Sequence, residues 1–130
     1  MNRNIQVRGI HAEVPESPLF SFVRYPEFVS TDVHCPTSIE PIERDSVLFA
    51  AVALAEWTRK WRELEKEKYE PGTTDFGQIS YDMDHARSQA YHWLDIYKIA
   101  ADAEAEQIQR GAIIDAEAAA KRRIERGEKP

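Results

Sequence analysis

Two stretches of the sequence repeat apolar residues at helical spacing, and a helix-breaking segment separates them. The first stretch places such residues four and three positions apart, at Ala50, Leu54, Trp57, Trp61 and Leu64. The second continues this spacing through Ile79, Met83, Ala86, Ala90, Trp93, Tyr97 and Ala100. Residues spaced in this way lie on one face of an α-helix. Because each apolar face needs a partner, the two stretches predict an antiparallel helical hairpin.

The segment between the stretches, YEPGTTD (69–75), contains the signals that end one helix and begin the next. Pro71 and Gly72 end the first helix, because proline cannot continue it and glycine favours a turn. Asp75, followed three residues later by Gln78, is typical of a capping box at a helix N-terminus. The second helix is therefore predicted to begin directly after this segment.

Antiparallel pairing about this connection sets large side chains opposite small ones. Trp57 and Trp61 fall opposite Met83, Ala86 and Ala90, and Trp93 and Tyr97 fall opposite Ala50, Ala51 and Leu54. A close-packed interior requires this alternation of large and small residues. Core packing therefore explains the aromatic residues better than a cofactor site does. No cofactor is expected.

The predicted fold is mainly α: a helical hairpin with a long or broken C-terminal helix and a short N-terminal extended or β segment. The single domain divides into an arm (1–40), a first helix (41–70), a second helix (75–110), and a segment (111–127) that continues the second helix or forms a third. The frequent prolines of the arm exclude a long helix there. Its alternating residues around Ile5 and Val7, and again in 19–25, indicate a short β-hairpin or edge strands, with turn residues in PESP (15–18).

The start of the first predicted helix, VLFAAVALA (47–55), is apolar on every side. A helix of this kind is buried on every side. Either the N-terminal arm or a second subunit is expected to cover it. The run is about half the length needed to cross a bilayer, so no membrane partner is expected.

The stretch DMDHARSQAYHWLD (82–95) carries two histidines among three aspartates. His85 and His92 lie seven residues apart, roughly 10 Å along a helix, which is too far for one metal ion to bridge. The helix face that they share is half apolar and is predicted to be an interaction face, made of His85, Ser88, His92, Ile96, Ile99 and Ala103. No metal is expected. The alternative is a module that binds a small ligand or a metal through the histidines with Asp82 and Asp95.

The second helical pattern continues well beyond the reach of the first, as far as Arg126. It would span roughly 75 Å if continuous, against about 45 Å for residues 41–69. The excess carries an apolar stripe that predicts an oligomer contact: Ala101, Ala105, Ile108, Ala112, Ala116 and Ala119. A homodimer is the simplest arrangement. A third helix that folds back after Gly111 would bury the same stripe within one chain.

The remaining evidence on function is compositional. The net charge of −6 opposes binding to nucleic acid or to anionic membranes, and the one cysteine, Cys35, suits the cytoplasm. The sequence contains no nucleotide-binding loop, zinc-ligand spacing or nucleophile elbow. We therefore expect a non-enzymatic, self-associating module that binds another protein as an adaptor, inhibitor or assembly component. A phage or mobile-element accessory protein is one such class, and an acidic nucleic-acid mimic is the other alternative.

Overall fold

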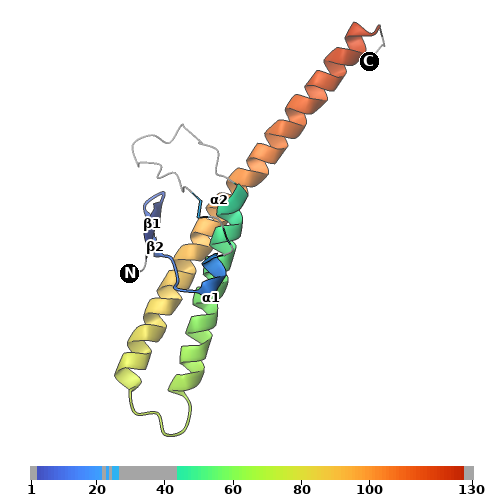
Figure 1. The fold of residues 1–130 in the computed structure, drawn as a ribbon. Helices are drawn as coiled ribbons and strands as arrows, with labels where there is room; N and C mark the ends of the chain where they lie inside the picture. Colours follow the sequence, from blue (N-terminus) through green and yellow to red (C-terminus); the bar gives the residue numbers. More distant parts are fainter. Residues whose placement is uncertain (1–2, 22, 24, 27–43, 128–130) are drawn as a thin grey trace.

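Two long helices dominate the structure, and they run antiparallel as the two apolar stretches predict (Figure 1). The computed structural model describes residues 3–21, 23, 25–26 and 44–127. In chain order the elements are strands β1 (Asn4–Val7) and β2 (Ile10–Glu13), the 3₁₀ helix η1 (Pro18–Ser21), and helices α1 (Arg44–Lys68) and α2 (Phe76–Glu125). The prediction of a mainly α-helical hairpin with a long C-terminal helix is confirmed. None of the described helices is long and apolar enough to cross a membrane.

The connection between α1 and α2 ends the first helix where Pro71 and Gly72 predict it. The Thr73 hydroxyl lies 2.8 Å from the backbone carbonyl oxygens of Glu67 and Glu70, so it closes the last turn. Asp75 occupies the N-cap position of α2, but its side chain makes no capping hydrogen bond. The predicted capping box is therefore wrong, because Gln78 donates to Asp82 instead.

Helix α2 is continuous through Gly111, so the described chain has one long C-terminal helix rather than a second and a third. Its 50 residues correspond to about 75 Å, twice the length of the 25 residues of α1. The last buried residue of α2 is Ala103. We call residues 104–127 the projecting segment, which extends past the start of α1 (Figure 1).

The N-terminal β segment is an antiparallel hairpin in which Val7 pairs with Ile10. Its two turn residues, Arg8 and Gly9, have φ angles of 48° and 81°. Positive φ at both positions is the signature of a type I′ turn, whose twist matches that of the strands. The second strand and the turn thus lie earlier than predicted, and residues 18–21 form η1 instead of a strand.

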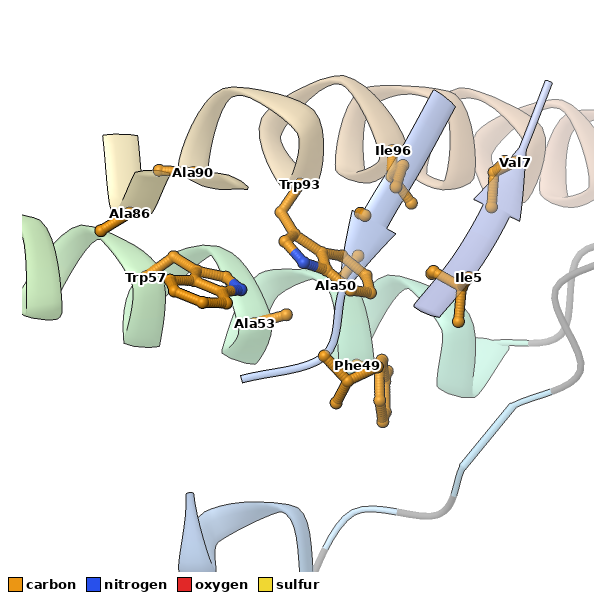
Figure 2. Packing of buried hydrophobic residues seen from close by; sticks show 12 residues of the cluster. Ile5, Val7, Phe49, Ala50, Ala53, Trp57, Ala86, Ala90, Trp93 and Ile96 are labelled. Carbon is orange, nitrogen blue, oxygen red and sulfur yellow. The ribbon is translucent and has the colours of Figure 1, made fainter. Parts of the chain in front are cut away.

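The core lies between the two helices and beneath the β-hairpin (Figure 2). Trp57 and Trp93 are buried among small residues of the facing helix, as the antiparallel pairing predicts. Trp61 and Tyr97 are half-buried and pack against the edge of this core. Alternation of tryptophan with alanine lets the helices approach closely while large apolar areas leave water.

Residues of the N-terminal segment of the same chain cover one side of the start of α1. Leu48 is 55% exposed, so the stretch 47–55 is not buried on every side as predicted. Phe49 is buried, and its ring centroid lies 4.9 Å from that of Phe20 and 5.1 Å from that of Tyr25. The Trp93 ring lies on another side of Phe49, at 5.8 Å. These rings connect the N-terminal segment to both helices. Cys35 and the predicted helix start at Pro41 lie outside the described residues.

Candidate functional site

Glu13, at the end of β2, connects the β-hairpin to both helices through its backbone. Its carbonyl oxygen accepts hydrogen bonds from the indole Nε1 of Trp57, at 2.9 Å, and of Trp93, at 2.7 Å. A carbonyl oxygen has two lone pairs, so one residue can satisfy both buried indoles. The two largest core side chains are therefore held in place by a single peptide group.

The other polar groups of Glu13 bind α2. Its backbone N–H donates to Oε1 of Gln89 at 2.7 Å, and its carboxylate Oε2 lies 2.9 Å from Nε2 of His85. We call Glu13 with its four partners the Glu13 anchor. Because every polar group of Glu13 has a partner on a helix, the anchor fixes the position of β2 along α2.

The predicted interaction face on α2 lies partly under this β-hairpin. Ile96 and Ala103 are buried, and Figure 2 shows Ile96 beside the two strands. His92 and Ile99 are half-buried, and Ser88 is exposed. The face is half apolar because residues far away in the sequence cover it. Ile96 and Ala103 therefore contact the interior of the same chain and are not accessible to a partner.

The histidines do not meet in the structure. His85 is paired with Glu13, and Asp82 accepts a hydrogen bond from Gln78 at 2.9 Å. Nδ1 of His92 is buried and has no hydrogen-bond partner. Within the described part of the chain, no three His, Cys, Asp or Glu side chains are grouped as a metal site would require.

The projecting segment differs from the rest of α2, because none of its residues is buried. Ile108, Ile114 and Ile124 have exposed fractions of 66%, 64% and 64%. Of the predicted oligomer stripe, Ala105, Ala112 and Ala116 are exposed, and Ala101 and Ala119 are half-buried. The alanines of the stripe and Ile108 share one face of the helix, whereas Ile114 and Ile124 lie on other sides. A contiguous apolar face that is exposed marks an interaction surface.

Charges of opposite sign flank the apolar part of the projecting segment. Residues 102–106 contain three acidic side chains and no basic one, and residues 121–126 contain four basic side chains and one acidic one. Between them, Glu106 and Arg110 form an ion pair of 2.6 Å within the helix. The segment is therefore acidic at its base, apolar in its middle and basic at its tip.

A groove of about 650 Å³ lies where α1 and α2 meet, and its lining includes Leu54 and Tyr97. Tyr97 lies about 20° from Ile108 around the helix axis, so the groove lies on the same side of α2 as the oligomer stripe. Arg59 on the rim donates to Glu56 at 2.7 Å. That hydrogen bond is the largest of the causes that raise the pKa of Arg59 above its ordinary value.

The chain matches no known protein family, no curated protein and no solved structure. Its own arrangement is therefore the basis for assigning a function. The Glu13 anchor holds the helical hairpin together, and its polar groups are used in doing so. The projecting segment has no such internal role among the described residues. It is therefore the candidate functional site.

Proposed function

We propose that the protein is a non-enzymatic helical interaction module that self-associates through the projecting segment. In this proposal the anchored hairpin is a rigid base that presents the segment to its partner. One observation carries the proposal. Helix α2 continues for more than twenty residues beyond its last buried position, Ala103, and this continuation exposes four isoleucines.

A helix without a partner leaves its apolar side chains in water. An isolated Ala-rich helix is only marginally stable, and burying one isoleucine side chain contributes about 1.5–3 kcal/mol. A helix that leaves Ile108, Ile113 and Ile114 in water gives up that stabilisation. A partner helix would supply this stabilisation by covering the isoleucines, and a second copy of the chain is present wherever the protein is. A closed dimer is the commonest such assembly.

A homodimer suits the role of an adaptor, inhibitor or assembly component that docks on another protein. Two anchored hairpins joined through their projecting segments would form a bivalent particle. Bivalency raises the effective concentration of the second docking step, so two weak contacts act as one strong one.

Sedimentation of the full chain at tens of micromolar tests the proposal, with Ile108→Asp as the disrupting variant. We expect a dimer for the wild-type protein and a monomer for Ile108→Asp, because a buried unpaired carboxylate opposes association. Tyr81→Asp is the matched control, since Tyr81 is 70% exposed on the hairpin part of α2. It should remain dimeric. A monomeric wild-type protein, or a dimer that tolerates Ile108→Asp, would contradict the proposal.

A further inference from the structure

We propose that two copies pair antiparallel along their projecting segments, with the twofold axis near residue 114. The acidic base of each segment (102–106) then lies beside the basic tip (121–126) of the other. This inference rests on the proposed function, because it specifies the partner and the geometry of the same surface. Three observations on the described residues carry it.

The first observation is the order of charges along α2. In an antiparallel pair, the stretch 102–106 of one copy, which is negative overall, lies beside the stretch 121–126 of the other, which is positive overall, and this match occurs twice by symmetry. In a parallel pair, acidic bases would meet each other and basic tips would meet each other. Like charges held side by side disfavour association, so the charge order selects the antiparallel direction.

The second observation is the composition of the middle of the segment. Residues 111–120 read GAIIDAEAAA, with only Asp115 and Glu117 charged. Ile113 and Ile114 lie on different sides of the helix from Ile108 and are 50% and 64% exposed. A twofold axis near residue 114 puts residues 111–120, which carry only two charges, at the centre of the contact, and Ala112 and Ala116 form that centre on the side of Ile108.

The third observation is the match of side-chain sizes in this alignment. With the axis at 114, Ile108 of one copy lies opposite Ala120 of the other, and Ala112 lies opposite Ala116. Alanines let helices approach closely, and Ile108 then meets a small residue, as the tryptophans do in the core of the hairpin. A parallel pair would instead set Ile108 against Ile108. The paired length, residues 102–126, is about 37 Å, equal to that of α1.

Charge-reversal variants of the full chain test the direction of pairing. Arg122→Glu with Arg123→Glu makes both ends of the segment acidic, and Asp102→Lys with Glu104→Lys makes both ends basic. We expect each double variant to weaken self-association about tenfold at low salt. The quadruple variant combines all four substitutions. Its self-association should be within about threefold of that of the wild-type protein, because its charge order is reversed but still complementary. An equimolar mixture of the two double variants should form heterodimers more tightly than either forms homodimers.

A distance measurement gives an independent readout. In a Cys35→Ser background, a spin label at Ile124→Cys should report a separation between copies of about 30 Å along the helix axes. Parallel pairing would place the labels about 10 Å apart. Circular dichroism of each variant checks that the helices are retained.

The outcomes separate the two proposals. A wild-type dimer with labels about 10 Å apart, or with double variants that associate as well as wild type, overturns the antiparallel arrangement alone. A quadruple variant that self-associates as weakly as the double variants also overturns the antiparallel arrangement alone. A monomeric wild-type protein overturns the proposed function as well.

Discussion

The two halves of α2 belong to one continuous helix but differ in what surrounds their side chains. From Ile79 to Ala103 the helix buries eight residues, among them Trp93 and Ile96. From residue 104 to residue 127 it buries none. The first half is fixed by packing against α1 and the β-hairpin, and the second half is held by its own hydrogen bonds and by its continuity with the first.

This difference shows that helical pattern and helical stability are separate properties of a sequence. The apolar positions of the first half carry alanine together with tryptophan, isoleucine and tyrosine, and the larger side chains bury large areas. Those of the second half carry mostly alanine, which favours the helix but buries little surface. Four of the eight buried residues of the first half are alanines, and the second half exposes four isoleucines. The presence of α1 and the β-hairpin against the helix, rather than spacing alone, thus separates the half that builds a core from the half that remains on the surface.

The largest effect should come from the packed half. Replacing Trp93 by Ala removes a fully buried ring between α1 and α2 and should destabilise the fold by about 3–5 kcal/mol. Urea unfolding of dilute protein, monitored by circular dichroism, measures this. The matched change in the projecting segment, Ile114→Ala, should alter stability by less than about 0.5 kcal/mol. Equal losses for the two variants would show that the two halves do not differ in packing.

An intermediate effect is expected at the Glu13 anchor. Gln89→Ala leaves the backbone N–H of Glu13 without its acceptor in a partly buried position, which should cost about 1–3 kcal/mol. Gln78→Ala is the control, because its hydrogen bond to Asp82 is exposed and water replaces it. The same urea titration compares them. If the two variants lost stability equally, the anchor would contribute no more than a surface contact.

The smallest effect is expected within the projecting segment. Gly111 lies inside α2, and a Cβ added there meets no atom within 4 Å. Gly111→Ala should therefore favour the helix by about 0.5–1 kcal/mol. We expect this gain in helix stability to appear as slower amide hydrogen exchange in residues 104–125 of dilute protein. The urea midpoint of the hairpin should not change. A midpoint that rises by the same amount would show that both halves unfold as one unit.

The helical hairpin could be predicted from sequence because its signals are local. The spacing of Trp57 and Trp93 with small residues sets the pairing of α1 with α2, and Pro71 and Gly72 set the connection. The turn of the β-hairpin was placed wrongly because Arg8 adopts a positive φ that arginine rarely takes. An arginine at this position does not indicate a type I′ turn.

Neither the burial of Ile96 nor the Glu13 anchor could be predicted from the sequence, for two different reasons. Ile96 follows the period of an outward-facing position on α2, and only the tertiary placement of the β-hairpin buries it. The anchor uses the backbone carbonyl of Glu13, and every residue type offers that acceptor. Helix periodicity reports on one element at a time and contains no information on contacts 80 residues apart.

The Glu13 anchor also sets an order of events during synthesis. Glu13 is made 44 residues before Trp57 and 80 residues before Trp93. At ordinary translation rates the second interval lasts roughly 4–16 s. A two-stranded hairpin is not stable alone, so β1 and β2 have no surface to fold on during that time. Ile5 and Val7 therefore lack their cover until α2 leaves the ribosome, so we expect the β-hairpin to be made before the two helices and to fold after them.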